Sequence, residues 1–537
     1  MKLFFASFFV LGILFVFFLS IVLAVLYAME AINLWALFGF TALIYFFYWL
    51  ASPYISDWIF RLLYKLKWVG IEEIRHRDPE AAQFIETVCR DNKIKVPKIG
   101  FIPDDNPQAF VYGSAAFNAR MVFTNGIFTY LDTSERKAVF GHEIGHIVNR
   151  DFIIMTLAAF LVAVLYHMYW VLIRVRARKK AGVAIKIIAL TSFVFYIIGT
   201  YLLLYLSRLR EYYADQRSAQ WFSADALSRA LVRVAYGILA KSEKKRNSEL
   251  MQGTRALGIM DFKASNGLGL AYVTSAQLKS WEPIHRAFLF DLHNPWAFLY
   301  ELGSSHPLTA KRIRRLSQMG QVTTFDFEEI SRYPVDKKKL YVHFGKDAFF
   351  AFFPALAVGG SVLSYIILAG FSWLGVLGAG LIGFGIGTVV KTIYRYPGES
   401  PKEATTLELM EDVYTSPIRG KRRLLSGKII GRGIPGLIFS KDMMFQDRTG
   451  LIYLQYEGLV PFLNNLVFAL FKVGKLVGQE GRIDGWFFRA LVPRLELNFV
   501  KIGEKKFQSW VKFWGIGAGT FITLVGLGFL ILQLCAL

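Results

Sequence analysis

The sequence predicts a mainly α-helical protein that crosses a membrane several times and carries soluble units, the last of them rich in β-strands. Three observations support this prediction. The 537 residues are 54% hydrophobic with a mean hydropathy of +0.40, which is too apolar for an ordinary soluble protein. Seven apolar runs are each long enough to cross a bilayer as a helix. The polar stretches between them have the mixed composition of globular domains.

The first two apolar runs, Leu3 to Ala28 and Ile32 to Ala51, predict a transmembrane hairpin because the connector between them is very short. The first run exceeds the usual signal-peptide core of about 7 to 15 residues, so we expect it to be a retained anchor. The second run is followed by Arg61, Lys65 and Lys67. Basic residues favour the cytoplasmic side of a membrane, so we expect the chain to continue there.

A second hairpin interrupts the soluble unit that follows. Between Ser52 and Asp151, strand and turn signals precede a helix that starts near Thr133. The apolar runs Ile153 to Ile173 and Ala184 to Leu206 then leave this compartment and return to it. Their basic connector, residues 174–180, lies outside under this topology, against the positive-inside tendency. Partial insertion around a water-filled cavity would resolve the conflict.

The C-terminal part adds a Gly-rich hairpin, a β-rich unit and a last apolar helix. Short Val, Ile, Leu and Tyr runs broken by turn residues indicate a small barrel or sandwich, with the OB type among the options. This unit contains no His, so we expect a regulatory, partner-binding or substrate-presenting module. The predicted segments are 1–52, a hairpin; 53–345, a soluble domain interrupted by a hairpin at about 153–207; 346–396, the Gly-rich hairpin; 397–510, the β-rich unit; and 511–537, a final helix.

Charge and cysteine content exclude several classes. The net charge is +22, but the 40 acidic residues are scattered among the bases and no aromatic-interleaved basic motif is present. Basic loops that face anionic lipid explain the same excess of positive charge. We therefore expect the bilayer as a partner and no nucleic acid. The two cysteines, Cys89 and Cys535, are far apart, which excludes a disulfide framework and a thiolate cluster. Any metal must therefore be bound by His and carboxylate side chains.

The segment from Gly141 to His146 contains the motif H-E-x-x-H. On a helix this spacing places His142 and His146 on one face, one turn apart, with Glu143 beside them. Two imidazoles and one more protein ligand leave a fourth position on zinc for water, whose pKa falls to about 7. Glu143 is then the candidate general base. Chance produces this motif fewer than about 0.01 times in such a chain, although a hydrogen-bonded pair of buried histidines is an alternative.

Two further pairs are candidates for the same site. Glu211 and Asp215 share a helix face, so Glu211 suits the metal and Asp215 can orient a ligand imidazole. Such pairs also serve solubility on helices, but their position directly after the second hairpin favours the metal role. His306 and Arg312 could supply two donors to a tetrahedral oxyanion. A helix start and a solvated basic face explain these last two residues equally well.

The chain contains, in this order, H-E-I-G-H, a hairpin, E-Y-Y-A-D, and H-P followed by R-I. This series of motifs resembles the membrane metallopeptidases that include the HtpX heat-shock protease and the CAAX prenyl proteases. The stretch from Phe110 to Ile127 resembles the family's strand region, where substrate is expected to add as an extra strand. Asn149-Arg150-Asp151 also fits the family. The resemblance covers roughly residues 1 to 320, and the chain after about Lys346 has no counterpart in the HtpX pattern.

The resemblance implies a gluzincin-type α+β peptidase domain on the cytoplasmic side of a bacterial or archaeal membrane. It implies Glu-assisted attack of zinc-bound water on peptide bonds of membrane or misfolded proteins, and it leaves the oligomeric state open. The implied roles are one zinc ion held by His142, His146 and Glu211, catalysis by Glu143, and support from Asp215, His306 and Arg312.

Two other functions stay open from the sequence. One is a selective processing protease similar to the prenyl proteases. The other is a non-catalytic membrane scaffold that uses zinc structurally and binds partners through the β-rich unit. Glu143 argues against the scaffold, because a structural zinc site has no use for a base and closes its fourth position with a protein ligand.

Overall fold

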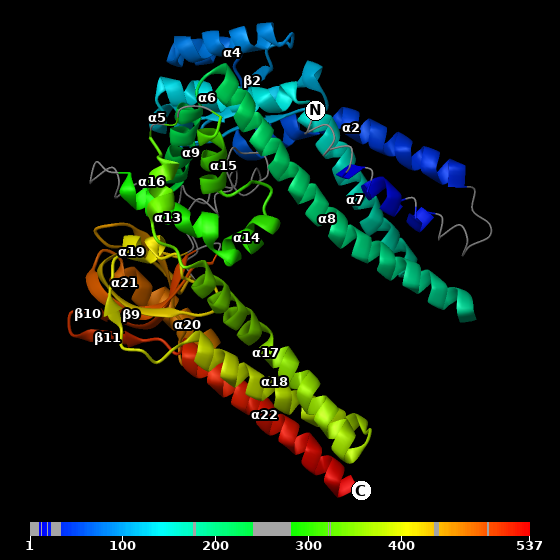
Figure 1. Ribbon diagram of the computed structural model, residues 1–537, viewed down its shortest axis with the longest axis vertical. Coiled ribbons are helices and arrows are strands. Elements are labelled where there is room, and N and C mark those ends of the chain that lie inside the picture. The colour runs from blue at the N-terminus through cyan, green and yellow to red at the C-terminus, as the bar shows by residue number, and fades with distance from the viewer. Residues whose placement is uncertain are drawn as a thin grey trace. The chain divides into compact units, whose positions relative to one another are not determined.

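The computed structural model describes residues 10–11, 13–18, 20–22, 34–174, 179–239, 281–319, 322, 324–433, 440–490 and 493–536 (Figure 1). Most of these residues are helical. They form two compact units. Of the described residues, the first unit holds those up to 239 and those from 299 to 327, and the second holds 281–298 and everything from 328 onward.

The elements up to residue 239 are α2 (Leu34–Tyr64), β1 (Lys67–Trp68), α3 (Ile71–Arg77), α4 (Pro79–Asp91), β2 (Lys98–Ile102), β3 (Ala109–Tyr112), η1 (Ala116–Asn118), β4 (Arg120–Thr124), α5 (Asn125–Tyr130), α6 (Thr133–Val148), α7 (Asp151–Leu172), α8 (Lys179–Trp221) and α9 (Ala224–Leu239).

The later elements are α13 (Glu282–His293), α14 (Pro295–Leu302), α15 (Thr309–Ser317), α16 (Phe327–Arg332), α17 (Lys337–Ala369), α18 (Trp373–Arg395), β5 (Lys402–Glu403), α19 (Thr406–Glu411), β6 (Lys421–Arg432), β7 (Met443–Gln446), β8 (Leu451–Gln455), α20 (Pro461–Val467), η2 (Phe468–Val473), α21 (Gly474–Leu476), β9 (Glu480–Phe488), β10 (Arg494–Ile502), β11 (Lys505–Gln508) and α22 (Val511–Ala536).

Five of the seven predicted spans are confirmed as long apolar helices, which fits a membrane protein. They are α7, most of α8, α17, α18 and α22. The first predicted run is helical where it is described, and its Val10, Leu14 and Phe18 pack in one cluster with α7 and α8. The connector to α2, and most side chains of the apolar first part of α2, lie outside the described residues. So do residues 175–178 of the basic connector.

A small sheet in the first unit lies next to the helix that carries H-E-x-x-H. Its strand order is β1-β2-β4-β3, with β2 parallel to β4 and the other pairs antiparallel. Within the described part of the chain, β3 pairs with β4 alone, so β3 is an edge strand. It also contacts α6. The edge strand of the sheet, β3, therefore lies beside the helix that carries His142 and His146.

Helix α8 is longer than the apolar run that predicted it. The apolar run ends at Leu206, but the helix continues without a break to Trp221 and includes Glu211 and Asp215. Because a helix rises 1.5 Å per residue, Glu211 lies about 7.5 Å beyond the last residue of the apolar run. One helix thus supplies both a candidate membrane span and two of the predicted site residues.

The second unit contains three long apolar helices that pack together, α17, α18 and α22 (Figure 1). Glycines allow the close approach. An added Cβ at Gly383 would lie 2.4 Å from the carbonyl oxygen of Ala357, and one at Gly387 would lie 2.5 Å from Cα of Pro354. On the other side, an added Cβ at Gly385 would lie 2.5 Å from the oxygen of Gly519. Gly383 and Gly387 therefore let α17 and α18 pack closely.

The β-rich unit is a closed five-stranded barrel. Strand β6 pairs with β7 and with β9, β8 pairs with β7, and β10 joins β8 to β9. The pair β8–β10 is parallel and the other four are antiparallel. A helical segment connects β8 to β9. This ring is the small barrel predicted from the strand pattern, and its strand order fits the OB type.

Candidate metal centre

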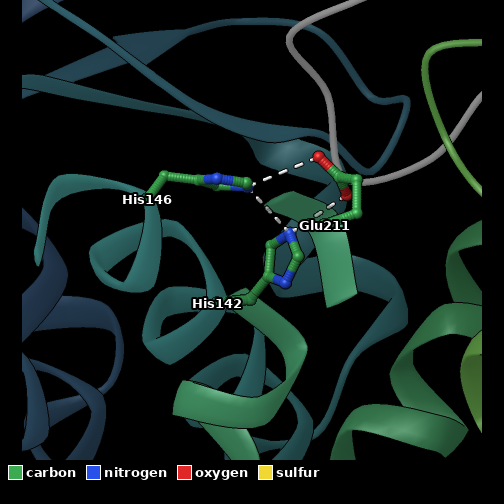
Figure 2. Close-up of side chains that lie close together, drawn as sticks. All are labelled: His142, His146 and Glu211. Carbon is green, nitrogen blue, oxygen red and sulfur yellow. Dashed lines mark hydrogen bonds and ion pairs between the residues drawn. The ribbon is translucent and has the colours of Figure 1, made fainter. Parts of the chain in front are cut away.

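Helix α6 presents the two histidines of the motif to each other. The helix begins at Thr133 as predicted, but its N-cap is Asp132, which forms a capping box with Glu135. His142 is fully buried and His146 is partly buried. Their Nε2 atoms are 3.2 Å apart and their rings are nearly perpendicular. Figure 2 shows both rings directed toward Glu211.

Glu211 on α8 adds a carboxylate to the two imidazoles. Its Oε2 lies 3.5 Å from Nε2 of His142, and its Oε1 lies 3.5 Å from Nε2 of His146 (Figure 2). All three side chains can place one ligand atom within 4.8 Å of the others. Ligands at about 2.0 to 2.1 Å in a tetrahedron around zinc are separated by about 3.3 to 3.4 Å. Two imidazoles and one carboxylate, with donor atoms this close together, therefore form a set that fits a zinc ion held by three protein side chains.

Two glycines of α6 allow α8 to come this close. An added Cβ at Gly145 would lie 3.1 Å from Cα of Ala214 and 3.2 Å from its oxygen. One at Gly141 would lie 3.3 Å from Oγ of Ser218, and that hydroxyl donates to the carbonyl of Ala138 at 2.6 Å. Gly141 and Gly145 thus allow α8 to come close enough for Glu211 to reach the two histidines.

Each imidazole faces a carboxylate with its second ring nitrogen. Nδ1 of His142 lies 2.9 Å from Oδ1 of Asp215, and Nδ1 of His146 lies 2.6 Å from Oδ2 of Asp151. A carboxylate at Nδ1 holds the proton there and leaves Nε2 free to bind a metal. Arg150, the residue before Asp151, has a left-handed backbone (φ 57°). That turn between α6 and α7 brings Asp151 back toward the motif.

Arginines hold both supporting carboxylates in place. Arg312 on α15 is buried and binds Asp215 through two nitrogens, at 2.8 and 2.6 Å. Its third nitrogen lies 3.5 Å from Oε2 of Glu211. Arg210 on α8 donates to the other oxygen of Asp151 and to the carbonyl of Asn149 at 3.1 Å.

The segment before α15 brings His306 to the same site. Nε2 of His306 lies 3.6 Å from Oε1 of Glu211, and the ring is 4% exposed. Arg208 on α8 fixes this segment, because one of its nitrogens donates to the carbonyls of Glu301, Leu302 and Ser304 at 2.7, 3.2 and 2.7 Å. The histidine is therefore supported by the same helix that carries Glu211.

Burial and neighbouring charges set the protonation of the motif residues. Burial raises the pKa of Glu143 to about 7, although the two histidines oppose the shift. Burial lowers the pKa of His146 to about 4. Burial also acts to lower the pKa of His142, but contacts with Asp215 and Glu211 outweigh it and raise that pKa to about 9. A metal must displace the proton from His142 when it binds.

Glu143 has a buried oxygen that is free to act. The side chain is 1% exposed, and its Oε2 has no hydrogen-bond partner among the described residues. A buried polar atom without a partner is costly in a finished core. Beside His142, His146 and Glu211, this unpartnered oxygen fits a group that binds a water molecule or a substrate.

The structure thus brings together the seven residues that the sequence predicted, from α6, α8, the 303–308 segment and α15. Arg312 contacts Asp215 and Glu211. Three supporting residues were not assigned a role from the sequence: Asp151, Arg208 and Arg210. Asp151 enters the sequence resemblance only as part of the tripeptide Asn149-Arg150-Asp151, and the two arginines carry no motif signal of their own. Their partners are far away in sequence, which no local pattern could reveal.

Comparisons with known proteins agree on one family. Residues 75–320 match peptidase family M48. The chain is 30% identical over 284 residues to a protease HtpX homolog of Thermoplasma acidophilum, an alignment that covers 50% of this chain and 81% of the relative. It is 31% identical over 186 residues to a protease HtpX homolog of Methanothermobacter thermautotrophicus, covering 35% and 66%. A third, from Aquifex aeolicus, is 28% identical over 281 residues, covering 50% and 80%. No solved structure matches the chain.

Proposed function

The chain belongs to peptidase family M48 and is a membrane metallopeptidase of the HtpX type, and from that premise we propose that it hydrolyses internal peptide bonds with one zinc ion held by His142, His146 and Glu211. The observation that carries this proposal is the cluster of donor atoms: the two Nε2 atoms lie 3.2 Å apart, and each lies 3.5 Å from a different carboxylate oxygen of Glu211. A metal bound there supplies a Lewis acid that polarises the scissile carbonyl and lowers the pKa of water.

Glu143 is the proposed acid and base. Its unpartnered oxygen accepts a proton from the attacking water, and the same carboxyl then gives that proton to the leaving amine. A pKa raised to about 7 by burial suits both transfers, because neither protonation state is strongly preferred near neutral pH. Asp215 and Asp151 keep the two imidazoles oriented meanwhile.

His306 is the proposed donor to the developing oxyanion. Its Nε2 lies 3.6 Å from Oε1 of Glu211. Arg312 is engaged with Asp215 through two nitrogens, so we propose that it acts by positioning Asp215 and Glu211. A donor aimed at the developing charge supplies about 2.7 to 4 kcal/mol of transition-state stabilisation in comparable sites.

We propose that a substrate adds as a strand to β3. This strand is at the sheet edge within the described residues and contacts α6. Main-chain hydrogen bonds at such an edge bind extended peptides with little dependence on sequence. This mode suits an endopeptidase that acts on unfolded segments.

The site's position supports membrane or misfolded proteins as substrates. Glu211 lies about 7.5 Å along α8 beyond the apolar run, and α7 starts at Asp151, which contacts His146. Helix α7 thus begins beside His146 and the apolar run of α8 ends shortly before Glu211, which supports a location near the bilayer surface. The basic residues after α2 favour the cytoplasmic side.

The test is cleavage of casein by the purified, zinc-loaded protein in detergent, compared with Glu143→Gln. Metal content is measured on both proteins by mass spectrometry. We expect one zinc per chain in both and a loss of about 10² to 10⁴ in rate in the variant. Loss of zinc together with activity in a chelator-treated control supports the metal assignment. Equal, undetectable cleavage by both zinc-loaded proteins would overturn the general endopeptidase and favour a selective processing enzyme or a scaffold.

A further inference from the structure

The helical segment that connects β8 to β9 is mostly apolar. It runs from Pro461 to Leu476 through α20, η2 and α21. Its inner side packs on the barrel, where Phe468 is buried and stacks on Tyr456 with ring centroids 3.7 Å apart. Ala469 and Val473 are also fully buried. These contacts account for only one side of the segment.

The opposite side, together with the two residues before Pro461, is exposed and apolar. We call it the outer apolar face; its members are Leu459, Val460, Phe462, Leu463, Val467, Leu470 and Phe471. Phe462 is 83% exposed and Phe471 is 63% exposed. A contiguous apolar surface of this kind marks an interaction site for a partner or a membrane. The question is which occupant it fits.

Hydrogen bonds tie the start of this face to the last membrane helix. The indole Nε1 of Trp514 donates to the carbonyl of Gly458 at 3.0 Å, and the backbone N–H of Trp510 donates to the carbonyl of Glu457 at 2.7 Å. Both tryptophans lie at the beginning of α22, which is long and apolar enough to cross a bilayer. Tryptophans at helix ends occupy the membrane–water interface. Gly458, directly before Leu459, is therefore at the level of that interface.

The end of α18 indicates the same position of the membrane–water interface. Nζ of Lys512 donates to the carbonyl of Tyr396, the C-cap of α18, at 2.7 Å. Since α18 ends where α22 begins, both spans reach the surface at this point. Lys472 and Lys475 are exposed beside the outer apolar face. Lysines next to an apolar helix face are typical of segments that lie in an anionic membrane surface.

We propose that residues 459–471 lie in the membrane interface, with the outer apolar face in contact with lipid acyl chains. The barrel is then attached to the bilayer at two places, through α22 and through this segment. A β-rich unit seated in this way stays close to the lipid surface, where it can meet the juxtamembrane parts of other membrane proteins.

The test uses the full-length chain with Cys535→Ser, in nanodiscs containing anionic lipid. Cys89 is buried and stays. Single cysteines replace Phe462 or Phe471 and carry an environment-sensitive fluorophore, which is challenged with a lipid-borne nitroxide or with aqueous iodide. Two matched variants calibrate the signal: Leu524→Cys on α22, 60% exposed in its apolar stretch, and Lys505→Cys on β11, exposed in the barrel. All four positions are exposed, so the labels leave the core intact.

We expect the nitroxide to quench positions 462 and 471 within about twofold of position 524 and at least about threefold more than position 505. Iodide should quench only position 505. If iodide quenches positions 462 and 471 as strongly as 505, the proposal is wrong. If neither quencher reaches them, a protein such as a second copy of this chain covers the face, and the bilayer is excluded as occupant.

Discussion

Oδ2 of Asp151 lies 2.6 Å from Nδ1 of His146, so the first residue of a candidate membrane helix contacts a proposed metal ligand on the preceding helix. The other oxygen of Asp151 binds Arg210, the neighbour of the third ligand in sequence. Asp151 therefore links α6, α7 and α8 at the metal site.

Asp151→Asn should weaken metal binding. Without the carboxylate the imidazole of His146 loses the charged acceptor that fixes its proton on Nδ1, and such changes typically cost 10- to 100-fold in affinity. Competition with a chromophoric chelator measures the effect. Asp347→Asn in the second unit is the matched control, because Asp347 is equally buried and bonded to Tyr394. Equal affinity of the Asp151 variant and the wild type would show that this carboxylate does not support the ligand.

Arg312→Lys should lower activity more than stability. The guanidinium binds both oxygens of Asp215 at once, and an ammonium group cannot reproduce that planar geometry. We expect a drop in kcat and in zinc affinity, each by about tenfold or more. Arg314→Lys on the same helix is exposed and serves as the control. If both variants keep wild-type kcat, the buried pair has only a structural role.

Gly145→Val should separate the third ligand from the other two. Its side chain would meet the backbone of Ala214 at about 3.1 to 3.2 Å from the first added atom, so α8 must move away. Overpacking of this kind costs about 1 to 3 kcal/mol of stability. Thermal unfolding and zinc titration should both show the loss. Gly345→Ala, where nothing lies within 4 Å of the added Cβ, should leave both unchanged.

Arg208→Gln should reduce kcat with little change in zinc affinity. The three carbonyls of residues 301–304 that this guanidinium binds would lose their buried donor, and the segment with His306 would become less ordered. The metal ligands keep their own contacts. Steady-state kinetics beside chelator competition separates the two effects. A parallel loss of zinc would place Arg208 in support of the ligands instead.

The sequence predicted much of the metal site because its signals are local. The motif spacing puts His142 and His146 on one face of a helix that begins where expected. The barrel was predicted from strand and turn spacing, and its ring of strands is observed. Arg208 and Arg210 escaped notice since their contacts depend on how distant segments pack. The extent of α8 was also missed, because polar residues after Leu206 mark the edge of the apolar run but do not end a helix.

The unbroken course of α8 has a mechanical consequence. Helix α8 is continuous from its apolar run to Glu211, so it cannot tilt or slide in the membrane without moving Glu211. His142 and His146 belong to another helix. Lipids whose tails are shorter or longer than the apolar run make such helices tilt or shift. We therefore expect membrane thickness to affect the distance between Glu211 and the two histidines, and acyl-chain length to change the activity.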